Sequence, residues 1–120
     1  MDADAMKSRT RAFALRVIKL VDSLPPGRVS EVLGKQLLRS ATSVGANYRA
    51  ARRSRSRAEF VSKLGIVEEE VDESCYWLEL LADSGVVRAS RLDELRTECD
   101  EITAIVVATI RSTKGTRKQA

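Results

Sequence analysis

An apolar or small residue recurs every three or four positions through the middle of the chain. This stripe consists of Phe60, Leu64, Val67, Val71, Ser74, Leu78 and Leu81. The alternating spacing places all of its side chains on one face of an α-helix. A single helix cannot bury such a face by itself, so the chain must supply other helices to cover it.

Three more segments show the same helical period, at about residues 5–24, 30–53 and 91–111, beside the segment at 57–84. Pro25 and Pro26 interrupt the pattern because proline cannot donate a helical hydrogen bond. Ser30 is expected to cap the second helix, Ser56 with Glu59 matches a capping box, and Gly85 is expected to end the third helix. Four amphipathic helices with short connections predict an all-α, antiparallel up-down four-helix bundle in one domain, residues 1–112.

Residues 111–120 carry four bases, no acid and no apolar pattern, so residues 113–120 are expected to form a flexible basic tail. No apolar run approaches the roughly 20 residues that span a bilayer, and no segment resembles a secretory signal. Cys75 and Cys99 lie within apolar helical patterns, where buried free thiols of a cytoplasmic protein are expected.

Histidine is absent, so the chain lacks the usual general base and the usual imidazole ligand for metals. Neither a P-loop nor a dinucleotide-binding glycine motif occurs. The acids of the third helix together fan around most of its circumference, so they are not expected to converge on one ion; they are Glu68, Glu69, Glu70, Asp72 and Glu73. We therefore expect no enzymatic activity, no cofactor and no metal site.

The charge is divided sharply between the two central helices. Residues 28–57 have a net charge of +7, whereas residues 58–85 have a net charge of −7. Five arginines fall within nine positions with no acid among them: Arg49, Arg52, Arg53, Arg55 and Arg57. Such a cluster repels itself and needs a counter-charge.

Two interpretations of this basic stretch remain open. In the first, it binds the phosphate backbone of RNA or DNA, because aromatic side chains for base stacking are scarce. The candidate residues are Lys35, Arg39, Arg49, Arg52, Arg53, Arg55 and Arg57. In the second, the arginines neutralise the acidic third helix, and the protein is a scaffold that docks other proteins.

A second apolar patch on the third helix is formed by Ile66, Trp77 and Leu80, with Glu70 and Glu73 pointing into it. The main stripe already fills the core position, so these five residues are expected at an interface between copies of the chain, although the bundle core is the alternative. A partly desolvated carboxylate needs a cationic partner, and Arg39 is the first candidate for Glu73. Loss of Glu73 is then expected to cause a large loss of stability.

Several residues also carry a resemblance to a family. They are Arg39-Ser40, Ser43 and Asn47 near the end of the second helix, the run Ser56-Arg57-Ala58-Glu59-Phe60, and Glu73 with Leu78. The pattern resembles the small bacterial four helix bundle protein family, which includes proteins encoded in intervening sequences of large-subunit ribosomal RNA genes and the accessory variability protein of retroelements. Many members have Asn-Ile-Ala-Glu-Gly where this chain has Asn47-Tyr48-Arg49-Ala50-Ala51, so a role of that glutamate does not transfer.

The resemblance implies a ring-like homopentamer, association with nucleic acid and no known catalytic activity. In retroelement members it implies a reverse transcriptase as partner. The sequence therefore predicts a non-enzymatic, homo-oligomeric accessory factor in the cytoplasm.

Overall fold

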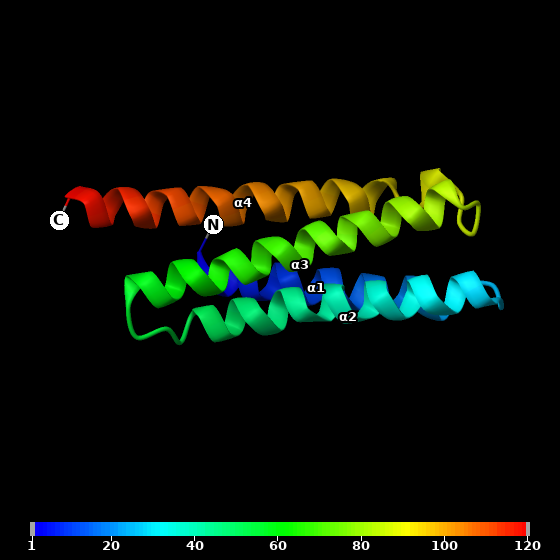
Figure 1. Ribbon diagram of the computed structural model, residues 1–120, viewed down its shortest axis with the longest axis horizontal. Helices are drawn as coiled ribbons and strands as arrows, with labels where there is room; N and C mark the ends of the chain where they lie inside the picture. Colours follow the sequence, from blue (N-terminus) through cyan, green and yellow to red (C-terminus); the bar gives the residue numbers. More distant parts are fainter. Residues whose placement is uncertain (1, 120) are drawn as a thin grey trace.

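The computed structural model describes residues 2–119, with side chains through residue 115, and in that part of the chain it contains four long helices and no strand (Figure 1). The helices are α1 (Ala3–Asp22), α2 (Arg28–Ala51), α3 (Arg57–Asp83) and α4 (Asp93–Gln119), with a short 3-10 helix, η1 (Ala89–Arg91), before α4. Consecutive helices run in opposite directions along a molecule 54 Å long and 21 Å across. The predicted all-α four-helix fold is confirmed.

The core contains the apolar stripes predicted from the helical period. On α3, the stripe residues from Leu64 to Leu81 are all buried, and Phe60 at its start is half-buried. The other helices contribute Phe13 and Val17 from α1, Leu37 and Val44 from α2, and Leu92 and Ile102 from α4. Burial of these side chains supplies the main driving force for folding.

Caps explain most of the helix ends. The Ser56 side chain accepts a hydrogen bond from the Glu59 amide at 3.1 Å, as the capping motif predicted. The reciprocal bond goes to the Arg55 amide, which donates to the Glu59 carboxylate at 3.3 Å. Gly85 follows α3 with a φ of +80°, a conformation that glycine adopts without steric cost, and so confirms the predicted stop.

Two helix ends differ from the sequence prediction. α2 begins at Arg28, with Gly27 at the capping position, so the prediction that Ser30 caps this helix was wrong and Ser30 is buried in the first turn. α4 continues to Gln119, past the end predicted near residue 111. The segment 113–119 therefore extends a helix, and its flexibility stays a prediction.

Small residues let α2 approach both of its neighbours. A Cβ at position 45 would lie 3.3 Å from Oγ1 of Thr10, closer than an ordinary van der Waals contact, so glycine at this position favours the close approach of α1 and α2. On the other side, the buried Ser74 hydroxyl of α3 donates to the Ser40 hydroxyl of α2 at 2.9 Å. These contacts fix the middle of α2 within the bundle.

α1 and α4 are joined by an ion pair that closes the bundle. Arg9 donates two hydrogen bonds to the Glu98 carboxylate, from Nε at 2.8 Å and from Nη2 at 2.7 Å, and it also contacts Glu101. Both side chains of the Arg9–Glu98 pair are mostly shielded, with exposed fractions of 24% and 14%. A bidentate pair of this kind is among the stronger polar contacts in proteins.

Candidate nucleic-acid interface

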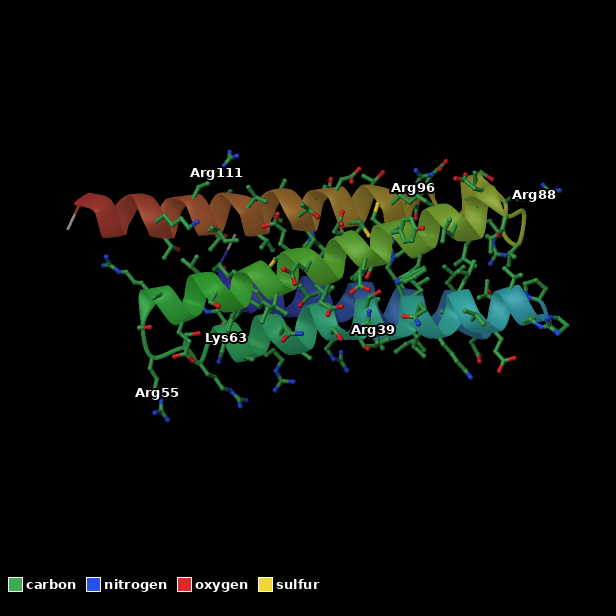
Figure 2. All side chains as sticks on the ribbon, viewed as in Figure 1. Arg39, Arg55, Lys63, Arg88, Arg96 and Arg111 are labelled. Carbon is green, nitrogen blue, oxygen red and sulfur yellow. The ribbon has the colours of Figure 1, made fainter. Side chains whose placement is uncertain are left out.

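The candidate site begins in the second half of α2 and continues into the turn at residues 52–56. Positions 44, 48 and 51 of α2 face the core, so Arg49 projects from another face into solvent, and Arg53 is exposed in the turn that follows. Arg55 and Arg57 lie on the turn and at the first position of α3, and both are exposed. Figure 2 shows the Arg55 side chain extending away from the bundle.

Two of the seven predicted binding residues have acidic partners. Lys35 contacts Glu31 of the preceding helical turn at 3.3 Å. Arg39 bridges to α3, where Nη2 donates to Glu73 at 2.8 Å and Nη1 donates to Glu70 at 3.3 Å. The predicted partnership of Arg39 with Glu73 and Glu70 is thus present, and it lies near the middle of the α2–α3 contact (Figure 2).

The Arg39 pair is more exposed than a buried interface pair. The side chains of Arg39 and Glu73 remain 48% and 43% exposed, whereas Glu70 is 17% exposed. Solvent screens such contacts, so the structure favours a smaller loss of stability on removal of Glu73 than the sequence predicted. Burial raises the pKa of Glu70, and the charge of Arg39 only partly opposes this effect.

The other five predicted residues form a group that we call the basic cluster: Arg49, Arg52, Arg53, Arg55 and Arg57. None of their guanidinium groups forms an ion pair with a carboxylate in the part of the chain that the structure describes. The acid nearest in sequence, Glu59, contacts Lys63 instead at 3.0 Å. The basic cluster is therefore a concentration of cations without a counter-charge.

Arg52 differs from the rest of the cluster because it also packs within the protein. Its guanidinium carbon lies 5.4 Å from the centre of the Phe60 ring, a cation–π contact that links the turn to α3. Burial raises the pKa of the Tyr48 hydroxyl, and the charge of Arg52 opposes that rise. Arg52 thus helps to hold the turn that presents its neighbours.

The sequence prediction omitted two cations of α1 that lie close to this surface. Lys7 and Arg11 line a groove between α1 and α2 together with Arg49. Both are exposed, and neither forms an ion pair among the described residues. Their spacing of four positions was a usable signal, but only the packing of α1 beside α2 relates them to Arg49.

The residues predicted for an interface between copies have mixed environments. Ile66 is 41% exposed, and the neighbouring Tyr76, which the prediction left out, is 52% exposed. Trp77 instead packs partly against the core of its own chain, with its ring centre 5.1 Å from that of Tyr76, and Leu80 is half-buried. Glu70 and Glu73 contact Arg39, as described above. Assignment of these five residues to an interface remains a prediction.

The acidic side of α3 offers no metal site among the residues that the structure describes. Glu68, Glu69 and Asp72 have no cationic partner there and line a shallow hollow against α4. Cys75 and Cys99 are free thiols, and burial raises the pKa of both. A thiol in this state is a poor nucleophile at neutral pH.

None of the described helices is both long enough and apolar enough to cross a bilayer. Comparison with curated protein sequences found no match. A solved structure does match: a protein of unknown function from the S23 ribosomal protein family of Bacteroides thetaiotaomicron. It is 35% identical to this chain, with a TM-score of 0.83 over 92% of this chain and 99% of the other.

The family model described as "23S rRNA-intervening sequence protein" matches residues 4–108, which include α1 except its first residue, all of α2 and α3, and most of α4. The predicted resemblance is therefore confirmed, and the chain belongs to the family of 23S rRNA-intervening sequence proteins.

Proposed function

We propose that the protein is a non-enzymatic accessory factor of the cytoplasm that binds the phosphate backbone of RNA or DNA through the basic cluster. The observation that carries this proposal is the absence of acidic partners around Arg49, Arg53, Arg55 and Arg57 in the described chain. Exposed cations held at one end of a rigid bundle favour polyanions as partners. The description of the matching family, 23S rRNA-intervening sequence protein, agrees with this proposal.

Backbone contacts of this kind give binding with little sequence specificity and a strong dependence on salt. Each phosphate that a cation neutralises adds about 0.7–0.9 to the slope of log affinity against log salt concentration. Arg111 and Lys114 are exposed cations of α4. Figure 2 shows Arg111 toward the same end of the molecule as Arg55. Lys35 and Arg39 contribute less, because their partners already supply a counter-charge.

A second candidate function is self-assembly or docking of another protein. It is favoured by the exposed apolar side chains of Ile66 and Tyr76, which lie on α3 beside acids that have no cationic partner. The family resemblance suggests a homopentamer and, for retroelement relatives, a reverse transcriptase as partner. Under this proposal, assembly repeats the basic cluster around an axis, so that several weak phosphate contacts act together.

The test measures the affinity of the purified protein for labelled single-stranded RNA and DNA of about 20 nucleotides, by fluorescence anisotropy from about 50 to 300 mM salt. The test variant replaces Arg53, Arg55 and Arg57 with Gln. Its matched control replaces Lys19, Arg28 and Arg88, which are exposed cations near the other end of the helices.

The test variant is expected to lose about 100-fold in affinity at 0.1 M salt, and its slope is expected to fall by about 2. The control variant is expected to bind like the wild type. If the wild type does not bind at about 50 mM salt, or if both variants bind equally well, the nucleic-acid proposal fails. Sedimentation of the same samples tests self-assembly separately, and a monomer at tens of micromolar contradicts it.

A further inference from the structure

We propose that the groove between α1 and α2 is a second phosphate site, which takes consecutive phosphates of the same nucleic-acid strand. The proposal rests on the function proposed above and assigns to it residues of α1. The groove has a volume of about 520 Å³. It is bordered by Lys7 and Arg11 of α1 and by Arg49 of α2.

Small residues create this groove. Gly45 eases the approach of the two helices, since a Cβ there would lie 3.3 Å from Oγ1 of Thr10, closer than an ordinary contact. Ala14 and Ala46 line the groove on either side, and the short side chain of Ala46 is exposed. Larger residues at these positions would fill the space that a backbone phosphate needs.

The charge of the groove is uniformly positive. Its lining contains three cations and no acid, and none of the three cations forms an ion pair within the described chain. The hydroxyl groups of Ser8 and Thr42 add short polar side chains to the lining. Arginine, lysine and hydroxyl groups are the side chains that contact phosphate oxygens in complexes with nucleic acid.

The dimensions of the groove suit a polymer better than a single ion. From Lys7 to Ala14 the helical rise of 1.5 Å per residue gives a length of about 10 Å. One strand of a duplex carries about three phosphates over that axial distance.

The groove also leads into the basic cluster. Arg49 belongs to both, and Arg53 lies four positions later, in the turn just after the end of α2. The beginning of α1 lies at the same end of the molecule as the turn between α2 and α3 (Figure 1). A strand that enters the groove at Arg49 can therefore continue toward the turn along the exposed Arg53.

Two variants test the groove without altering the turn. The first, Lys7→Gln with Arg11→Gln, removes two cations, and its control is Lys19→Gln with Arg28→Gln. The second, Ala46→Leu, fills the groove without changing the charge, and its control is Ala104→Leu, at an exposed alanine of α4. Both controls have the same change of charge or volume as their test variants. Circular dichroism checks that all four variants keep the helicity of the wild type.

With the single-stranded oligonucleotides used above, the double Gln variant is expected to lose about 25-fold in affinity at 0.1 M salt, with a slope lower by about 1.4. Ala46→Leu is expected to lower the affinity about fivefold, the loss that corresponds to one phosphate contact. Amide NMR signals of Thr42, Gly45 and Ala46 are expected to shift when the oligonucleotide is added to the wild type.

If the wild type binds but both groove variants match their controls, the groove proposal is overturned and the proposed function stands. If the groove variants lose affinity while the Arg53, Arg55 and Arg57 variant does not, the groove is supported and the basic cluster is the wrong surface. A wild type that binds neither oligonucleotide removes both proposals.

Discussion

The two halves of α2 carry cations of the same kind in different surroundings. Lys35 and Arg39, in the first half, face carboxylates at 2.8–3.3 Å. Arg49, near its end, and Arg53, in the turn just after it, face none in the described chain. The net charges of the two central segments would cancel if all of these groups met. The groups do not all meet, because most acids of α3 lie toward the middle of that helix, whereas the unpaired arginines lie at or near the turn between α2 and α3.

This comparison shows that a count of charges does not identify a binding surface. A cation with a fixed carboxylate beside it must give up that contact, or share it, before it can bind a phosphate. A cation without a neighbouring carboxylate loses no contact when it binds a phosphate, and its electric field reaches into solvent. The contrast between paired and unpaired cations can be tested in three ways. One removes unpaired cations, another removes the shielded Arg9–Glu98 pair between α1 and α4, and the last frees the paired Arg39.

The largest effect is expected from charge reversal in the unpaired half. Arg49→Glu, Arg53→Glu and Arg57→Glu together remove three phosphate contacts and add repulsion, so affinity for single-stranded RNA or DNA is expected to fall by more than about 100-fold. Fluorescence anisotropy at 0.1 M salt measures the loss. Reversal of Lys19, Arg28 and Arg88 gives the same net charge and is expected to retain most of the binding. Equal losses in the two triple variants would mean that net charge alone governs binding.

A shielded ion pair is expected to affect stability instead of binding. Hydrogen bonds from Arg9 hold the pKa of Glu98 below its ordinary value of 4.5. Glu98→Gln is therefore expected to lower the free energy of unfolding at pH 7 by about 1.5–3 kcal/mol, the range for a hydrogen bond to a charged group. Urea denaturation measures this difference. Glu94→Gln, at a 94% exposed carboxylate of the same helix, serves as the control.

The sign of the pH dependence follows from the lowered pKa. The contribution of Glu98 is complete above pH 4.5, the ordinary value, and is lost as the pH falls through the lower pKa of the folded state. The stability difference between wild type and Glu98→Gln is thus expected to stay constant from pH 7 to about pH 5 and to shrink in more acidic solution. A difference that grows on acidification would contradict the pairing.

Freeing a paired cation is expected to increase binding modestly. Glu70→Gln with Glu73→Gln leaves Arg39 without a carboxylate, so it gains the freedom of the unpaired arginines. One new phosphate contact corresponds to about a fivefold gain in affinity at 0.1 M salt. The pair Glu68→Gln and Glu69→Gln changes the net charge equally without freeing a cation, and a smaller gain is expected. If both pairs of substitutions gain equally, the state of Arg39 is irrelevant to binding.

The smallest effect is expected from Glu73→Ala on thermal stability. Arg39 and Glu73 are about half-exposed, and Glu70 remains as a second partner for Arg39. The melting temperature is expected to change by less than about 2 °C, as for other solvent-screened pairs. Differential scanning fluorimetry at low and high salt checks this expectation. A drop of many degrees would show that the pair is buried in an assembly of several copies.

The sequence predicted the helices well because local signals determine them. These signals lie within short segments: the three-four spacing on α3, the capping side chain of Ser56, and the glycine at position 85, which adopts a positive φ. The sequence predicted the pair of Arg39 and Glu73 correctly, because a carboxylate among apolar residues is costly unless a cation pairs with it. Ser30 was assigned wrongly as a cap, since Gly27 permits α2 to begin one turn earlier.

The groove and the Arg9–Glu98 pair could not be predicted, because both depend on contacts between distant segments. Arg9 and Glu98 are 89 positions apart. Trp77 shows a related limit, because helical periodicity alone placed it outside the core face. α3 crosses its neighbours obliquely (Figure 1), and the indole packs partly against the core. Its Nε1 atom is shielded, without a hydrogen-bond partner in the described chain.

The elongated shape has a consequence for how charge acts on this molecule. The bundle is 54 Å long, whereas the Debye length in physiological salt is about 8 Å. Fields from the two ends are therefore screened from one another. The attraction of a polyanion to one end therefore depends on the local excess of cations and not on the net charge of +4. The far end remains electrostatically independent, so it can hold another partner without competing with the first.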